Sequence, residues 1–154
     1  MTKCFPRLRQ ISWTKEMFEV AIFYCQHQTD RMMQVLRTLD GPAAPKIRKV
    51  ALPCSGKLEI SFLLKALENG ADAVALFGCP EGECHYLVGS TRAKNRVRYA
   101  RRILGDIGLE EERIRRFVLA EPTPSGEMGS LTEWVSKIES MGSLNRKATG
   151  KLQN

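Results

Sequence analysis

The spacing of hydrophobic positions along the chain alternates between two periods, which indicates strands and helices in turn. Apolar runs rich in β-branched and aromatic residues predict four buried strands, at residues 19–25, 46–53, 71–79 and 113–120. Between them, apolar residues recur at three- and four-residue intervals and predict helices over residues 29–41, 58–70 and 91–106. A capping box, "SLTE" at residues 130–133, predicts the start of a last helix that carries Leu131, Trp134, Val135 and Ile138.

This alternation predicts right-handed crossovers and a parallel sheet with helices on both faces. We therefore expect one α/β domain built on a flavodoxin-like, four-stranded sheet with the strand order 2-1-3-4. The domain is predicted to occupy residues 19–141. Residues 1–18 and 142–154 lack the periodic pattern and are predicted to be an N-terminal extension and a basic C-terminal tail.

The composition narrows the class of protein. At 154 residues the chain has room for one domain with a real core. No apolar run reaches the roughly 20 residues that span a bilayer, and no signal peptide follows the basic start "MTKCFPRLRQ". We therefore expect a cytoplasmic protein without a transmembrane segment. The chain has five cysteines, and disulfides are rare in a reducing compartment. Metal binding or catalysis therefore better explains any cysteines that cluster.

The net charge of +7 and the pI of about 9.4 suggest either a solvated basic surface or docking to an acidic protein. Aromatic residues make up only 7% of the chain, and no stacking platform of interleaved aromatic and basic residues is visible. We therefore expect no nucleic-acid partner.

Four of the cysteines follow predicted strands. Cys25 closes the first strand, Cys54 follows the second, and Cys79 follows the third, with Cys84 on the next loop. Because parallel strands end at the same edge of a sheet, these thiols are expected to converge where the strand order reverses. Cys4 has no such position and is interpreted as ordinary packing.

Sulfur-only ligation suits zinc or an iron–sulfur cluster. The spacing C-x4-C of Cys79 and Cys84 matches the first pair of plant-type [2Fe–2S] ligation, although the following C-x2-C is missing. A thiol–disulfide site instead requires a thiol of low pKa near a helix N-terminus, and Cys54 is the candidate. Spacing therefore favours a metal without choosing which.

Two longer stretches carry a family resemblance: "CSGKLEISFLLKALENGADAVALFGCPEGECHY" and "GSTRAKNRVRYARRILGDIGLEEERIR". They resemble the delta subunit of methyl-viologen-reducing hydrogenase, an iron–sulfur family tied to heterodisulfide reductases. The resembling motifs are Cys54-Ser55-Gly56, Gly78-Cys79 and Cys84-His85-Tyr86, together with Gly89, Ala93 and Arg96 in the third helix.

The resemblance implies a non-catalytic component that carries one [2Fe–2S] cluster in a multi-subunit oxidoreductase. Such proteins pass electrons from a hydrogenase, formate dehydrogenase or similar donor to a partner that contains flavin and iron–sulfur clusters. That partner is like the A-type component of heterodisulfide reductase, which often bifurcates electrons. Carried over by position, Cys54, Cys79 and Cys84 are the matched ligand candidates, and Cys25 matches the first cysteine of a C-x2-C pair.

This chain departs from the family at two positions. Gln28 replaces the second cysteine of the C-x2-C pair, and Pro80 stands where histidine is usual. Cys25, Cys54, Cys79 and Cys84 still supply the four thiols that one cluster needs. We expect His85 to act next to the ligands, by hydrogen bonding to a cluster sulfur. The alternatives are a non-redox adaptor with an empty or zinc-filled site, and a thiol–disulfide protein that uses Cys79 and Cys84.

Overall fold

The structure, a computed structural model, describes residues 17–119 and 125–144. Within these residues the chain forms one parallel four-stranded sheet of β1 (Glu19–Cys25), β2 (Lys46–Leu52), β3 (Ala73–Gly78) and β4 (Ile114–Val118). The α-helices are α1 (Thr29–Leu36), α2 (Ile60–Glu68), α3 (Gly89–Asp106) and α4 (Ser125–Met141). Short 3-10 turns connect them: η1 (Gln26–Gln28), η2 (Arg37–Leu39), η3 (Ser55–Lys57) and η4 (Glu111–Arg113).

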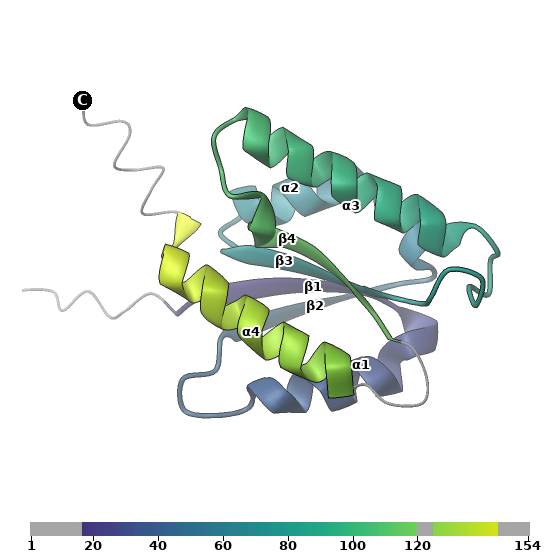
Figure 1. The fold of residues 1–154 in the computed structure, drawn as a ribbon, viewed down its shortest axis with the longest axis horizontal. Helices are drawn as coiled ribbons and strands as arrows, with labels where there is room; N and C mark the ends of the chain where they lie inside the picture. The colour runs from purple at the N-terminus through teal and green to yellow at the C-terminus, as the bar shows by residue number, and fades with distance from the viewer. Residues whose placement is uncertain (1–16, 120–124, 145–154) are drawn as a thin grey trace, which may run out of the picture.

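The sheet has the strand order β2-β1-β3-β4, and each neighbouring pair is parallel. Helices α2 and α3 cover one face of the sheet, and α1 and α4 cover the other (Figure 1). This confirms the predicted α/β fold, its strand order and the helices on both faces. The strand order reverses between β1 and β3, which are hydrogen-bonded neighbours.

The core lies on both sides of the sheet because side chains alternate along each strand. In β1, Val20 and Ile22 join the cluster under α1 and α4, whereas Ala21 and Phe23 join the cluster under α2 and α3. Strand β3 is buried along its whole length. This explains why its sequence reads as an unbroken apolar run rather than as an alternating one.

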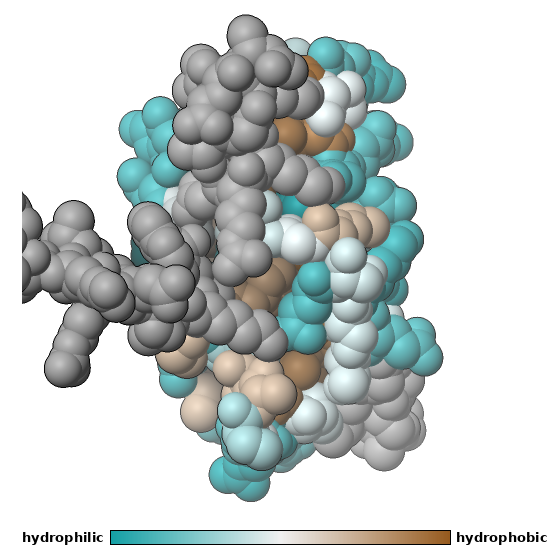
Figure 2. Space-filling model, turned by 90° about the vertical axis from the view of Figure 1, so that its left-hand side faces the viewer, coloured by the Kyte–Doolittle hydropathy of each residue, from teal (hydrophilic) through white to brown (hydrophobic). Residues whose placement is uncertain are grey.

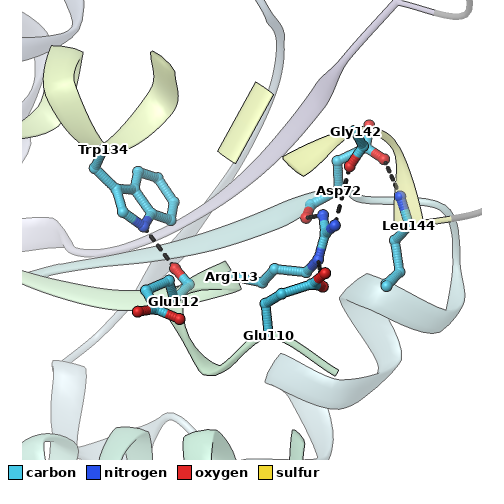
Figure 3. A network of polar contacts seen from close by, with 7 residues as sticks. All are labelled: Asp72, Glu110, Glu112, Arg113, Trp134, Gly142 and Leu144. Carbon is cyan, nitrogen blue, oxygen red and sulfur yellow. Dashed lines mark hydrogen bonds and ion pairs between the residues drawn. The ribbon is translucent and has the colours of Figure 1, made fainter. Parts of the chain in front are cut away.

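A network of buried polar groups closes the end of the sheet at which the strands begin (Figure 3). The side chain of Arg113, which is fully buried, donates hydrogen bonds of 2.8–2.9 Å to three groups: the Glu110 carboxylate and the carbonyls of Asp72 and Gly142. The carboxylate of Asp72 accepts from the backbone N–H groups of Glu19 and Leu144, both at 3.0 Å. Buried charge is tolerated here because each group has a close partner.

Figure 2 looks at the same end of the molecule and shows apolar side chains gathered among hydrophilic ones. Met17, directly before β1, and Ile107, at the C-terminal end of α3, are 68% and 61% exposed. No helix in the described part of the chain combines the length and apolar character that crossing a membrane requires.

The structure corrects the predicted helix boundaries. Helix α4 begins at Ser125, so the predicted capping box at residues 130–133 was wrong: Ser130 lies inside the helix and accepts a hydrogen bond from Arg115 at 2.6 Å. The four apolar residues assigned to this helix are nevertheless all buried, as predicted: Leu131, Trp134, Val135 and Ile138. Helix α3 begins two residues earlier than predicted, at Gly89, and α1 ends at Leu36, where the chain tightens into η2.

Candidate metal centre

The four cysteines that follow strands lie at one edge of the sheet, opposite to the Arg113 network. Cys25 is the last residue of β1, Cys54 lies two residues beyond β2, and Cys79 directly follows β3. Cys84 lies on the loop that leads into α3. All four are free thiols and are no more than 7% exposed. The predicted convergence is therefore observed, whereas Cys4 lies outside the described residues.

Cys54 and Cys84 form the closest pair, with their Sγ atoms 4.0 Å apart. Two glycines make this approach possible. A Cβ atom on Gly89 would lie 2.4 Å from the Sγ of Cys54 and 3.0 Å from that of Cys84, and a Cβ on Gly56 would lie 2.6 Å from the Cα of Gly89. Contacts below 3.0 Å essentially do not occur, so a side chain at Gly89 would displace the Cys54 sulfur and one at Gly56 would displace the backbone of α3.

An arginine holds the loop that carries Cys54. The guanidinium of Arg96, on α3, donates to the carbonyl oxygens of Gly56 at 2.8 Å and Leu58 at 2.7 Å. These bonds attach η3 to α3 and thereby fix Cys54 beside Cys84. Gly89 and Arg96 belonged to the family resemblance, but their roles could not be read from the sequence.

A second set of polar contacts fixes Cys79. Its carbonyl oxygen accepts hydrogen bonds from the hydroxyl of Ser90 and, at 2.9 Å, from the guanidinium of Arg116. Its Sγ atom accepts from the side-chain amide of Gln28 at 3.3 Å. Sequence reasoning noticed Gln28 only as a missing cysteine.

Backbone N–H groups surround the thiols. Cys25 accepts hydrogen bonds from the N–H groups of His27 and Ser55, and Cys54 accepts from Gly56 at 3.3 Å. Cys84 accepts from three N–H groups at and just before the start of α3, those of Tyr86, Gly89 and Ser90. An environment so rich in N–H donors suits sulfur that carries negative charge.

The pKa values of the thiols reflect a competition between burial and these donors. Burial raises the pKa of Cys25 and of Cys54, and neighbouring thiols raise it further, so the N–H donors offset the effect only in part. Burial also acts to raise the pKa of Cys84, but hydrogen bonds from backbone N–H groups and from Cys54 outweigh it, and the pKa is lowered. Because the two pKa values shift in opposite directions, Cys54 is the donor and Cys84 the acceptor in their contact.

This result corrects the expectation that Cys54 is the thiol of low pKa. The helix whose N-terminus approaches the thiols is α3 rather than α2, and it acts on Cys84.

The histidines lie on the outer rim of the site. His27 and His85 are exposed, with ring centroids 4.8 Å apart, and His85 also contacts the ring of Tyr86 at 5.0 Å. Hydrogen bonding of His85 to a cluster sulfur stays a prediction.

The ligand geometry differs from that of a site for one ion. Among residues 17–119 and 125–144, no three side chains of His, Cys, Asp or Glu converge on a point where they would hold a single metal ion. Instead, Cys54 and Cys84 form a close pair. Cys25 and Cys79 lie near enough to interact electrostatically with Cys54 and with each other.

Comparison with known proteins adds independent observations. Residues 20–142, which include all four thiols, match the family model described as "Methyl-viologen-reducing hydrogenase, delta subunit". Over 102 residues the chain is 35% identical to the D-type iron-sulfur subunit of the F420-non-reducing hydrogenase vhu of Methanocaldococcus jannaschii, a match that covers 66% of this chain and 76% of that protein. The corresponding protein of Archaeoglobus profundus is 36% identical over 103 residues, 67% of this chain and 73% of its own length.

A different kind of relative is much longer. The A-type component of the ferredoxin:CoB-CoM heterodisulfide reductase of Methanosarcina mazei is 34% identical over 98 residues, which are 64% of this chain but only 12% of that protein. The family model spans the sheet, the helices on both faces and the thiol edge. This chain therefore belongs to the methyl-viologen-reducing hydrogenase delta subunit family.

Proposed function

We propose that this chain is an electron-transfer component that carries one [2Fe–2S] cluster, held by Cys25, Cys54, Cys79 and Cys84. The observation that carries the proposal is the convergence of four buried, free thiols at one edge of the sheet, each beside N–H donors. Sulfur-only ligation is typical of iron–sulfur clusters and of structural zinc. The membership of a hydrogenase subunit family favours iron–sulfur.

The shape of the site supports a two-iron cluster over a single zinc ion. A zinc ion needs four sulfurs at about 2.3 Å from one point, and the described thiols do not converge in this way. The thiols of a [2Fe–2S] cluster bind two iron ions in pairs and are therefore spread over a wider space. The pair of Cys54 and Cys84 fits one iron, which leaves Cys25 and Cys79 for the other.

A buried hydroxyl also fits this assignment. The Oγ atom of Ser55 is buried and has no hydrogen-bond partner among the described residues, while its backbone N–H donates to Cys25. A buried hydroxyl without a partner costs about 1–3 kcal/mol, and the sulfur atoms of a cluster beside it would supply an acceptor. Binding of iron would also deprotonate the thiols whose pKa burial raises.

When bound, such a cluster accepts and releases one electron. The chain's own residues bind it, exclude water from it and leave one side open to a partner. Beyond Cys84 the loop residues Tyr86, Leu87 and Val88 are 50%, 83% and 50% exposed. A partner that covers this apolar loop would reach the thiols without unfolding any part of the domain.

The relatives support a particular pair of partners. The shorter ones are named as iron–sulfur subunits of hydrogenases, and the longer one is a heterodisulfide reductase component that contains the same module within a single chain. Because this module occurs both as a separate protein and within the longer reductase chain, we infer that it works beside such a chain. We therefore propose a relay from a hydrogenase, or another donor dehydrogenase module, to a flavin-containing partner like the A-type component of heterodisulfide reductase. We assign it to the cytoplasm, where free thiols persist.

Metal analysis of the protein purified without oxygen tests the proposal. We expect about two iron and two acid-labile sulfide ions per chain, with a visible absorption band that dithionite bleaches. Cys25→Ser should lower the iron content or shift the spectrum, whereas the matched control Cys4→Ser should change neither. A colourless chain that contains zinc or no metal would overturn the cluster and support an adaptor.

A separate measurement tests the thiol–disulfide alternative. The lowered pKa of Cys84 is the observation that favours it, although the thiol 4.0 Å away is Cys54 rather than the predicted Cys79. A reversible, redox-dependent shift in electrophoretic mobility in a protein without iron would establish a disulfide and exclude the relay.

A further inference from the structure

Gln28 reaches the candidate metal centre from outside the set of cysteines. It is the last residue of η1 and precedes α1, so it follows the strand that ends in Cys25. Its side chain is half-buried, and its Nε2 atom lies 3.3 Å from the Sγ of Cys79, a residue 51 positions away in the sequence. This contact connects the chain after β1 with the chain after β3.

The orientation of the Gln28 amide is determined by its neighbours. The Nη1 atom of Arg31 lies 3.4 Å from the Oε1 of Gln28 and 3.2 Å from the carbonyl oxygen of Leu119. A guanidinium only donates hydrogen bonds, and a thiolate only accepts them. An amide between the two must therefore turn its oxygen to Arg31 and its N–H to Cys79.

We propose that Gln28 donates a hydrogen bond to the Cys79 thiolate of the cluster and thereby raises the cluster's reduction potential, with Arg31 as its positioning residue. This role rests on the proposed function, because it concerns a cluster that the four thiols hold. It assigns to Gln28 a contribution of its own at the place where the motif otherwise has a thiol.

The sign of the effect follows from charge. Reduction adds one electron, and part of its charge spreads onto the ligand sulfur atoms. An N–H donor stabilises the more negative state more strongly, so the potential rises, and hydrogen bonds to the sulfurs are one of the main determinants of cluster potentials. The backbone N–H of Gly56 makes a bond of the same length to Cys54. The donor of Gln28 belongs to a side chain and can be removed by substitution.

The direct test measures the midpoint potential of the iron-loaded protein by spectroelectrochemical titration. Gln28→Met keeps the length of the side chain and removes the donor. We expect the ratio of reduced to oxidised cluster at a fixed potential to fall about tenfold, which is a decrease of about 59 mV for a one-electron couple. Gln34→Met, the same exchange at an exposed position of α1, should leave the potential unchanged.

Arg31 is tested by a variant that keeps its charge. Arg31→Lys retains the positive charge but loses the planar fork that contacts Gln28 and the Leu119 carbonyl. We expect a potential between those of the unaltered protein and Gln28→Met. In the Gln28→Met background the same exchange should have no further effect, because no amide remains to be oriented.

A second measurement detects the hydrogen bond directly. Pulsed electron paramagnetic resonance of the reduced protein, labelled with nitrogen-15 in its glutamine side chains, should show weak coupling between the cluster and one amide nitrogen. Gln34→Met should preserve that coupling.

The outcomes separate this inference from the proposed function. A chain that binds no iron would overturn both. A cluster that forms but shows no amide coupling, or an unchanged potential in Gln28→Met, would overturn the role of Gln28 and leave the relay function intact.

Discussion

Replacement of Gly89 by alanine is the most direct perturbation of the candidate metal centre that leaves every cysteine in place. Gly89 is the first residue of α3, and its Cα faces both members of the close thiol pair. The added Cβ would lie 2.4 Å from the Sγ of Cys54 and 3.0 Å from that of Cys84. Ordinary contacts begin at 3.4 Å, so Cys54 must retreat by about 1 Å and Cys84 by about 0.4 Å.

These displacements affect the metal site and the fold to different degrees. Metal–ligand distances are maintained within about 0.2 Å, so a retreat of about 1 Å exceeds that tolerance several times. The fold suffers less. Overpacking typically costs about 1–3 kcal/mol, and alanine recovers up to about 1 kcal/mol of helix propensity. We therefore expect Gly89→Ala to lose most of its iron while its free energy of unfolding falls by only about 0–3 kcal/mol.

The assay compares iron and sulfide per chain with the free energy of unfolding of the iron-free protein in urea. Gly105→Ala is the matched control, because Gly105 lies on the same helix. A Cβ there would meet only the Glu111 side chain, at 2.7 Å from its carboxylate, and this exposed side chain can swing away. The control should keep its iron and gain up to about 1 kcal/mol. Full iron content in Gly89→Ala, with an unchanged visible spectrum, would refute the proposed position of the thiols.

Substitutions at three further positions test other contacts of the structure. Arg96→Met removes the bonds that hold the loop of Cys54 to α3, and it should lower the affinity for iron about tenfold, measured by competition with a chelator. Ser90→Ala removes the hydroxyl that bonds to the Cys79 carbonyl, and it should lower the free energy of unfolding by about 1–3 kcal/mol in urea; Ser90→Thr, which keeps a hydroxyl, should lower it less. Arg113→Met removes a fully buried guanidinium from the opposite end of the sheet (Figure 3). It should lower the free energy of unfolding, measured in urea, by about 3 kcal/mol. Because Arg113 is remote from the thiols, its loss should not alter the iron content of the protein that remains folded.

Much of the fold could be predicted because its signals are local and repeated. The strands β1 and β3 are buried on both faces, so nearly every residue in them is apolar and their positions could be read within two residues. The start of α4 could not be read in this way. The pattern of Ser130 followed by Glu133 describes a capping box but also occurs inside helices, and only the contact with Arg115 on β4 shows which applies.

The candidate site also has features that could be predicted from the sequence and features that could not. The convergence of the thiols could be predicted because parallel strands bring their ends to one edge whatever their side chains are. The contact of Gln28 with Cys79 could not, since it joins two loops and leaves no pattern in either. The lowered pKa at Cys84 depends on where the N-terminus of α3 points, and this direction is set by the contact between Gly56 and Gly89.

The two ends of the sheet therefore differ in what they contribute to the protein. Where the strands begin, the buried charges of Arg113 and Asp72 have close partners within the chain, so this end stabilises the fold without a ligand. Where the strands end, burial raises the pKa of two thiols, and the hydroxyl of Ser55 is buried without a partner among the described residues. The unpaired hydroxyl costs about 1–3 kcal/mol, and a bound cluster would supply sulfur acceptors for it. If so, loading with iron should raise the midpoint of thermal unfolding, and Arg113→Met should lower the midpoint without reducing that increment. An equal midpoint with and without iron would show that the thiol edge is satisfied without a cluster.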